Sequence, residues 1–327
     1  MSAPKFIEIH GLGAPAEPKA LPQTFGAPYA GRAARLYEFI LPASASALQR
    51  VCDTMFNGPT GGAFKYEPLM PLVFISLIDA VKLNAVDPVV SQIGWFRESD
   101  TVFWFLALAT DPSGVRSVCG VPLYCFVDQP QALLTGREVH AWPKELSTLT
   151  LTGADSDFSS LAVSTIGMRA FGPDVQAGPI DILRISQVPG SAGVTPANLL
   201  GSFDDVLRVI WDVSGAALSL LRHGAVSDLL AEIRGGAVPL SFLKQFRDAV
   251  DGSTACYQAI VSVPMRASAI RRGGLLPGTF TVELPDNASH PIASDLGLDP
   301  AALTSIKGLW LDFDFVIERG TEVWRAQ

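Results

Sequence analysis

The chain has 327 residues, of which 48% are hydrophobic and 17% are charged. That length fits one large domain or two small ones and suffices to bury a sizeable core. The net charge is −8 and no run of Lys or Arg occurs, which argues against nucleic acid as a partner because a phosphate backbone requires a basic face. The sparse charge favours a homo-oligomer, in which sister subunits cover apolar surface.

The sequence predicts a cytoplasmic protein that does not enter a membrane. The first residues contain no apolar segment of the kind found in signal peptides, and the longest apolar stretch, 101–110, is too short to span a bilayer. No Cys-x-x-Cys pair occurs, so the cysteines are expected to be reduced thiols. The histidines lack metal-ligand spacing, and we expect neither a metal nor a cofactor.

Short strands dominate the first half of the chain. Residues 1–30 are rich in Pro, Ala and Gly and read as an extended N-terminal arm. One helix is predicted at 45–55 from its apolar spacing, and another begins near 131–134. Dense aliphatic and aromatic runs predict strands at 35–41, 69–78, 102–109, 115–127, 146–152 and 161–166. This succession favours an antiparallel sheet or barrel over alternating βαβ units.

The middle of the chain has a different pattern. Apolar residues at helical spacing run through 196–222, and 226–233 is a further candidate helix. We therefore predict a mainly helical insertion at about 171–235. Strands return at 256–263, 279–284 and 309–317. The predicted fold class is α+β: one domain, 31–327, with an antiparallel β-barrel-like core and the helical insertion.

Lys144 is the candidate nucleophile, because Trp142, Pro143 and Leu146 give it the most apolar company of any lysine in the chain. A lysine attacks a carbonyl only when its amine is neutral, and its ordinary pKa is about 10.4. Lowering that pKa by ~3–4 units costs about 4–5 kcal/mol, which burial or a nearby cation must supply. A surface lysine on an edge strand is the competing interpretation.

The segment around Lys144 resembles a known signature. Gly136-Arg137-Glu138, followed by Pro143-Lys144, looks like the Gly-Arg-Glu…Tyr-Pro-Lys-Lys signature of acetoacetate decarboxylases. Further segments resemble that family in the same order along the chain: 35–37 with 47–48, 94–99, 126–129 and 242–256. The resemblance covers about 30–170 and 238–325.

The resemblance implies a β-barrel-like fold, usually oligomeric, with the lysine in an apolar cavity. Lys144 would attack the ketone of a small keto acid, Arg35 would hold the carboxylate or shape the pocket, and Glu98 would orient the substrate or move a proton. Arg137 and Glu138 are interpreted as a structural ion pair under the strand. We assign the substrate pocket to Trp142, Phe126, Ser76 and Glu145.

Two positions depart from the family pattern. Glu145 stands where the family has a second lysine, and Ser76 falls nearest to a strand position where the family has an acid. An adjacent anion would raise the lysine pKa, but successive side chains on a strand face opposite sides. We therefore expect Glu145 to face away from Lys144, and burial to activate the lysine.

Several functions are compatible with this reading. The first is decarboxylation of a β-keto acid through a Lys144 Schiff base, and the second is aldolase or dehydratase chemistry on a pyruvate-like keto acid with Glu98 as base. A third is a non-catalytic small-molecule binding protein on the same fold, and a fourth a partner-binding scaffold. His140 is either a packed histidine or an acid–base group. Asp312 and Asp314 should share one strand face.

Overall fold

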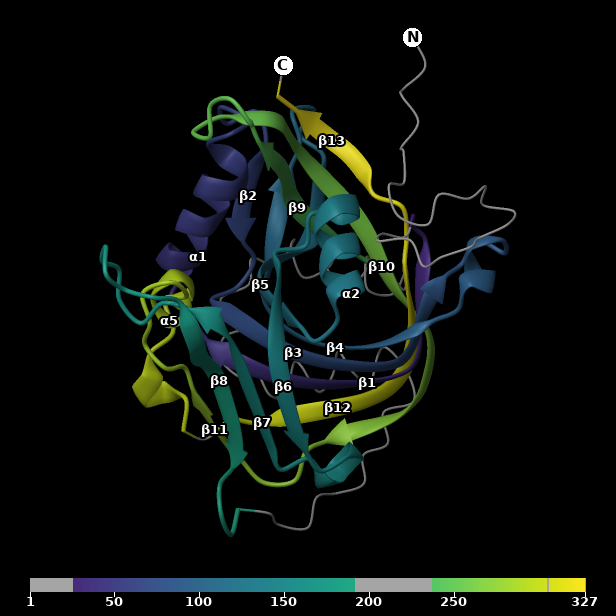
Figure 1. Cartoon of the computed structure of the whole chain (residues 1–327), viewed down its shortest axis with the longest axis vertical. Coiled ribbons are helices and arrows are strands. Elements are labelled where there is room, and N and C mark those ends of the chain that lie inside the picture. The colour runs from purple at the N-terminus through teal and green to yellow at the C-terminus, as the bar shows by residue number, and fades with distance from the viewer. Residues whose placement is uncertain (1–25, 192–236, 305, 327) are drawn as a thin grey trace.

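A computed structural model of the chain describes residues 26–191, 237–304 and 306–326. The described part is mainly β, with one large mixed sheet and few, short helices (Figure 1). The predicted α+β class is thus corrected to mainly β. The helices predicted at 196–222 and 226–233 lie outside the described residues, as do residues 1–25 of the N-terminal arm. Tyr29 and Ala30, assigned to that arm, already belong to the first strand.

The first half of the chain contributes the strands β1 (Tyr29–Pro42), β2 (Lys65–Pro68), β3 (Leu72–Ala85), β4 (Phe96–Thr110), β5 (Arg116–Val127), β6 (Lys144–Thr152), β7 (Ser160–Gly167) and β8 (Gly178–Gln187). The second half contributes β9 (Ala237–Arg247), β10 (Ala255–Leu275), β11 (Phe280–Glu283), β12 (Gly308–Ile317) and β13 (Thr321–Arg325). The described α-helices are α1 (Ala45–Cys52), α2 (Pro130–Thr135) and α5 (Ile292–Leu296). None of the described helices is long and apolar enough to span a bilayer.

Part of the sheet closes into a ring. Its strands follow the order β5-β9-β10-β12-β1-β3-β4, and β4 pairs again with β5. Most neighbours are antiparallel, as expected, but β5 pairs in parallel with β6 and, through the single residue pair Gly120 and Leu240, with β9. The ring is therefore nearly a barrel, and its weakest seam is the β5–β9 contact.

Strand alternation divides the interior into two cores. On β12, Leu311, Phe313 and Phe315 point into the ring, where they pack with residues such as Val102 and Phe242. The opposite faces of β1, β3 and β4 pack against a second layer formed by β6, β7, β8 and β11, which is seen at the lower left of Figure 1. Because side chains alternate along each strand, one face of these strands lines the inside of the ring and the other forms a separate core against the second layer.

The prediction of an insertion beginning near residue 171 is wrong where the structure describes it. Residues 178–187 form β8, which pairs with β7 and β11. Ile180, Ile182 and Ile185 are buried in the core between the layers. β-Branched residues on a half-buried strand explain why this segment extends the sheet instead of forming a helix.

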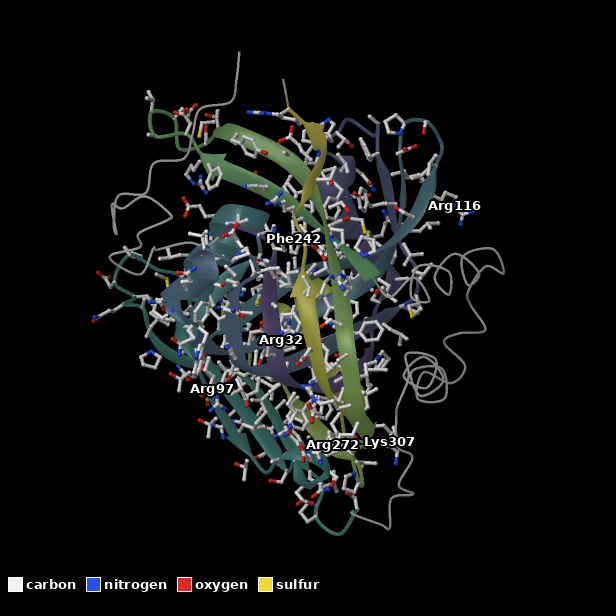
Figure 2. The ribbon with its side chains drawn as sticks, turned by 90° about the vertical axis from the view of Figure 1, so that its right-hand side faces the viewer. Arg32, Arg97, Arg116, Phe242, Arg272 and Lys307 are labelled. Atoms are coloured by element: carbon white, nitrogen blue, oxygen red, sulfur yellow. The ribbon has the colours of Figure 1, made fainter. Side chains whose placement is uncertain are left out.

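Asp312 and Asp314 lie together on the outer face of β12, as the alternation predicts. Arg271 donates from Nε to Asp312 Oδ1 at 2.9 Å and from Nη2 to Asp314 Oδ1 at 2.9 Å. Arg32 and Arg272, both labelled beside β12 in Figure 2, complete the cluster through ion pairs of 3.4 Å with Asp314 and Asp312. Both carboxylates are thus paired with arginines on the outside of the ring.

Candidate active site

Strand pairing brings Lys144 to Glu98 across 46 residues of sequence. Lys144 is the first residue of β6 and lies opposite Cys125 of β5, and β5 in turn pairs with β4, which carries Glu98. The Lys144 Nζ atom donates to Glu98 Oε1 at 2.5 Å. Both residues are buried, with 8% and 6% of their surface exposed. The lysine that ends the Pro-Lys signature therefore forms a buried ion pair with Glu98.

The Gly-Arg part of the signature supports the lysine. Gly136 lies against its aliphatic stem, and a Cβ at that position would be 2.6 Å from Lys144 Cδ and 2.9 Å from Cε. Arg137, interpreted from the sequence as half of an ion pair with Glu138, donates from Nη1 to the Lys144 backbone carbonyl at 3.1 Å. The Lys144 Nζ also lies 5.8 Å from the centre of the Trp142 ring. The stem, backbone and ammonium group of Lys144 are thus each held by a neighbour.

The electrostatics of the pair correct one expectation. Burial lowers the pKa of Lys144, but the neighbouring charges, chiefly that of Glu98, raise it by more, so the pKa lies above its ordinary value. Burial is therefore not what activates the lysine in the ligand-free protein. A neutral amine requires that the ammonium proton be transferred, and Glu98 is within hydrogen-bond distance to receive it.

A second carboxyl group lies beside the pair. Asp100 follows Glu98 by two residues on β4, so both side chains face the same side, and its Oδ1 is buried without a partner among the described residues. Burial, and then the charge of Glu98, raises the pKa of Asp100 to about 8. At neutral pH Asp100 is therefore mostly a neutral acid that can hold or release a proton next to Lys144.

Tyr29 and His140 complete the surroundings of the lysine. The Tyr29 hydroxyl and His140 Nδ1 are 2.7 Å apart, and His140 is buried. Burial, followed by the charges of Lys244 and Lys144, lowers the pKa of His140 to about 4, so its ring is neutral at physiological pH. His140 is thus a packed histidine that holds the hydroxyl of Tyr29, a residue of the cavity wall.

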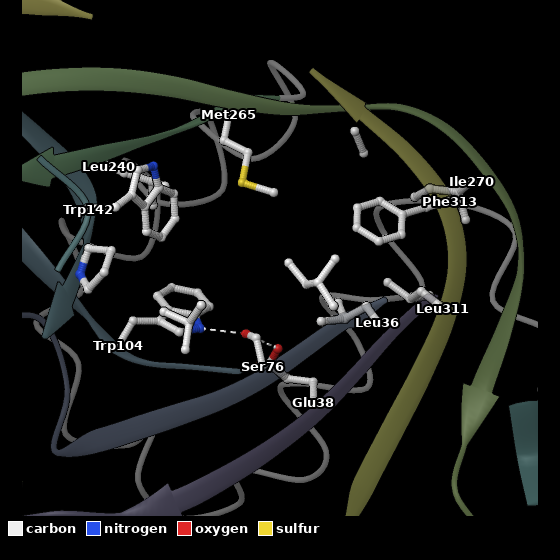
Figure 3. A pocket seen from close by; sticks show the side chains of 14 residues that line it. Leu36, Glu38, Ser76, Trp104, Trp142, Leu240, Met265, Ile270, Leu311 and Phe313 are labelled. Atoms are coloured by element: carbon white, nitrogen blue, oxygen red, sulfur yellow. Dashed lines mark hydrogen bonds between the residues drawn. The ribbon is translucent and has the colours of Figure 1, made fainter. Parts of the chain in front are cut away.

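Lys144, Glu98, Asp100 and Tyr29 line a small cavity of about 30 Å³. It adjoins a larger, apolar cavity of about 200 Å³ inside the ring (Figure 3). Four residues line both cavities: Ile78, Val102, Trp142 and Met265. A small charged site therefore adjoins a wider apolar chamber, and the two have these four residues in common.

The structure places Trp142 and Ser76 of the predicted pocket in the wall of the larger cavity. The Ser76 Oγ donates to Glu38 Oε2 at 2.6 Å and accepts from Trp104 Nε1 at 2.7 Å, as Figure 3 shows. Lys144 and Glu98 belong to the smaller cavity. These four predicted residues therefore come from β3, β4, β6 and the segment just before β6 to neighbouring parts of one interior.

The other three predicted residues lie on the opposite faces of their strands. Arg35 forms an ion pair of 2.7 Å with Asp155, whereas its neighbour Leu36 lines the cavity. Phe126 is buried in the core between the layers. Glu145 is 2.8 Å from Nε2 of His290, which packs against the Phe126 ring. Alternation explains all three positions, and the expectation that Glu145 faces away from Lys144 is met.

Sequence reasoning missed Glu38, Asp100 and Tyr29. Glu38 is a lone acid between Tyr37 and Phe39 in a buried strand, a pattern that indicates a carboxyl group with a special environment. Asp100 could have been found from Glu98, because residues two apart on a strand share a face. No local pattern identifies Tyr29, which reaches the site through pairing of β1 with β3 and β12.

Comparison with solved structures identifies the architecture. Acetoacetate decarboxylase from Legionella pneumophila subsp. pneumophila str. Philadelphia 1 superposes with a TM-score of 0.59 at 15% identity, covering 99% of each chain. The chain has the acetoacetate decarboxylase-like fold. An acetoacetate decarboxylase-like enzyme from Sphingomonas wittichii RW1 gives a TM-score of 0.54 at 13% identity over 92% of this chain and 94% of that one.

A biosynthetic enzyme also has a similar fold. The enduracididine biosynthesis enzyme MppR, solved in complex with pyruvate, gives a TM-score of 0.55 at 11% identity over 92% of this chain and 91% of that one. No protein-family sequence model and no curated protein matches the chain. At these identities the comparisons establish the fold, which in the solved neighbours serves enzymes, and leave the reaction to the chemistry of the site.

Proposed function

We propose that this protein is a carbon–carbon lyase that binds a small keto acid as a Schiff base on Lys144. The observation that carries the proposal is the buried 2.5 Å contact between Lys144 Nζ and Glu98 Oε1 in the wall of a cavity. An ion pair that served only stability would not have to line a cavity. Burying two charges is costly, and a functional site is where such a cost is commonly retained.

The reaction begins with proton transfer from the Lys144 ammonium to Glu98. The neutral amine then attacks the ketone carbon: a C–N bond forms and the carbonyl π electrons move to oxygen. One proton of the attached nitrogen passes to that oxygen and makes it a hydroxyl. Protonated Glu98 then gives its proton to the hydroxyl, which leaves as water while the nitrogen lone pair forms the C=N bond of an iminium ion. General acid–base catalysis of this kind contributes typically ~10²–10⁴-fold. Glu98 is within hydrogen-bond distance of the Lys144 Nζ atom, where both transfers would take place.

The iminium ion accepts the electrons of the bond that breaks. In a β-keto acid, the C–C bond to the carboxylate breaks, CO₂ leaves and an enamine forms. Proton delivery to the enamine carbon, followed by hydrolysis, releases the ketone and the free lysine. Asp100, with its pKa raised to about 8 mainly by burial, is protonated at neutral pH and suited to that delivery.

A second candidate is condensation or dehydration of a pyruvate-like keto acid. Two carboxyl groups beside one lysine favour it, because removing a proton from the carbon next to the iminium requires a base, and Glu98 becomes one once water has left. MppR, which has a similar fold, was solved in complex with pyruvate. Both candidates share the Lys144 iminium ion and differ only in which bond supplies the electrons.

Borohydride reduction tests the shared step. Protein incubated with acetoacetate, pyruvate or longer homologues and then reduced should gain the mass of the bound acid less one oxygen, or, where CO₂ has left, the mass of the remaining ketone less one oxygen. Lys144→Met should abolish the gain, whereas Lys82→Met, on β3 of the same ring but exposed, should retain it. If no keto acid adds mass to the native protein, the Schiff-base proposal is refuted.

Two product assays separate the candidates. Release of CO₂ from a β-keto acid indicates decarboxylation, whereas exchange of the pyruvate methyl protons in D₂O indicates an enamine formed by deprotonation. We expect CO₂ release as the faster reaction. Methyl exchange without CO₂ release from any β-keto acid would favour the condensation candidate.

A further inference from the structure

The larger cavity carries a polar feature that the Schiff-base chemistry does not use. Glu38 lies on β1 and lines this cavity with Trp104 and Ser76, among walls that are otherwise almost wholly apolar (Figure 3). Only 5% of Glu38 is exposed, and its Oε1 is buried without a hydrogen-bond partner among the described residues. A buried oxygen left unpaired in an apolar chamber is costly, so its presence requires an explanation.

The hydrogen bonds around Glu38 have one direction. An indole N–H can only donate, so Trp104 Nε1 donates to Ser76 Oγ at 2.7 Å. The Ser76 hydroxyl is then free to donate onward, to Glu38 Oε2 at 2.6 Å. Oε2 is thus occupied as an acceptor, and Oε1 is the oxygen left to carry a proton and donate it.

Glu38 has the protonation state that this role requires. Burial raises the pKa of Glu38 to about 8, and the hydrogen bond from Ser76 opposes the rise only in part. Glu38 is the one titratable group among the 14 described residues that line the larger cavity. The residues that face Glu38 from the neighbouring strands do not titrate: Ser76 on β3, Trp104 on β4, and Leu309 on β12, which is the register partner of Glu38. The nearest titratable groups in the adjoining cavity are Glu98, Asp100 and Lys144.

Strand register indicates how far the hydrogen-bonded group of Glu38 and Ser76 lies along the sheet from Glu98, the partner of the reacting lysine. Ser76 lies opposite Val102, whereas Ala80, four residues further along β3, lies opposite Glu98. At about 3.3 Å per residue, the two polar ends are separated by roughly 13 Å along the strands. Acetoacetate or pyruvate is too short to reach both. The volume of about 200 Å³ compares with the roughly 150 Å³ of an apolar cavity that holds benzene.

We propose that this chamber selects keto acids with a ring-sized apolar body that ends in a neutral oxygen acceptor, and that Glu38 donates the hydrogen bond that recognises this oxygen. The keto acid head would occupy the smaller cavity at Lys144, so the substrate class rests on the proposed function. The preference of the chamber for a neutral oxygen acceptor does not depend on the proposed function, and it can be measured without any reaction.

Binding of two matched probes tests the chamber alone. Anisole carries an ether oxygen where ethylbenzene has a methylene group, and neither contains a ketone that could react with Lys144. Calorimetric titration at pH 6 should give a preference for anisole over ethylbenzene that is about tenfold greater in the native protein than in Glu38→Leu. Glu283→Leu, which removes an exposed carboxylate on β11, should leave the preference unchanged.

The pH dependence of the preference adds a test that needs no apolar substitution. Above the pKa of Glu38 the carboxylate repels an ether oxygen, so the preference for anisole should fall between pH 6 and pH 9.5. In Glu38→Gln the amide still donates and does not titrate, so the preference should stay level. A pH effect that persists in Glu38→Gln would assign the titration to Glu98, Asp100 or Lys144 and overturn the role of Glu38.

Reduction with borohydride then connects the chamber to Lys144. 4-(4-Methoxyphenyl)-2-oxobutanoate should label Lys144 at a lower concentration than its 4-ethylphenyl analogue. Glu38→Leu should remove this difference, Glu38→Gln should keep it, and neither substitution should change labelling by pyruvate. If no keto acid labels Lys144 while the anisole preference is present, the proposed function fails and the chamber's preference stands. If Lys144 is labelled but neither probe pair is distinguished, the inference about Glu38 is overturned.

Discussion

Replacing Gly136 with alanine would place a methyl group against the stem of Lys144. The new Cβ would lie 2.6 Å from Lys144 Cδ and 2.9 Å from Cε, whereas carbon atoms pack best at about 3.5–4.0 Å. The lysine backbone is held by Arg137 and its Nζ by Glu98, so neither end of the stem can easily give way. The ammonium group should therefore move by about 1 Å, and a displacement of that size can lower a rate by ~10²-fold.

The same substitution should change stability much less than activity. Overpacking costs about 1–3 kcal/mol. Alanine gains about 0.5–1 kcal/mol over glycine in a helix, and Gly136 has helical dihedral angles of −62° and −48°. The free energy of unfolding should therefore fall by no more than about 2.5 kcal/mol.

The assay is the rate of borohydride trapping with a saturating keto acid, measured alongside urea unfolding. Gly178→Ala is the matched control, because it has open space around its Cβ position and no positive φ. Trapping in Gly136→Ala within twofold of the native rate would refute the argument that this glycine positions the lysine.

Three further predictions follow from the charges around the cavities. Glu98→Gln should lower turnover by ~10²–10⁴-fold, and it should move the acidic limb of imine formation to lower pH, because the charge that raises the pKa of Lys144 is removed; an unmoved limb in a stopped-flow pH profile would contradict this. Glu145→Gln should leave that limb in place, since Glu145 pairs with His290 on the other face of β6; a shift of a unit would show that it reaches the cavity. The pKa of Glu38 is raised from 4.5 to about 8 by burial, so the stability that this group contributes is fully present below pH 4.5 and is lost as pH rises towards about 8. Glu38→Gln should therefore reduce the fall in unfolding free energy between pH 5 and pH 8 by a few kcal/mol, as measured by urea titration.

The sequence predicted Lys144 and Glu98 because each lies in a short segment with the family's spacing. It also predicted most strands: 35–41, 102–109 and 309–317 lie within β1, β4 and β12, and 115–127 begins one residue before β5 and ends with it. These signals are local: dense apolar runs and a signature of nine residues. The pairing of β4 with β5 and of β5 with β6, which joins the two residues into one site, is not local and had to come from the structure.

The failures have a common physical cause. Arg35 and Phe126 were assigned to the pocket from their position in matched segments, but a shift of one residue along a strand reverses the face. Leu36 and Glu38 therefore face the cavity, and Arg35 pairs with Asp155. The activation of Lys144 was assigned to burial because the sequence did not show that Glu98 would contact its Nζ atom.

The prediction of a homo-oligomer remains a prediction. Large apolar side chains exposed on the described surface include Trp95 at 58% and Phe171 at 72%. Such residues are compatible with subunit contacts, and single exposed apolar residues are also common on monomers. Sedimentation of the native protein would distinguish these states.

The central claim is that Lys144 forms the Schiff base, and the sharpest rival is Lys244. Burial lowers the pKa of Lys244, which favours a neutral amine, and its Nζ donates to the Val139 carbonyl at 2.9 Å. Lys144 has the raised pKa but lines the cavity beside Glu98. Peptide mapping after borohydride reduction with a keto acid compares the two directly. We predict the added mass on the peptide that contains Lys144, with none on the peptide that contains Lys244. Label on Lys244 alone would contradict the account, because nucleophilicity would then follow the lowered pKa and not the cavity.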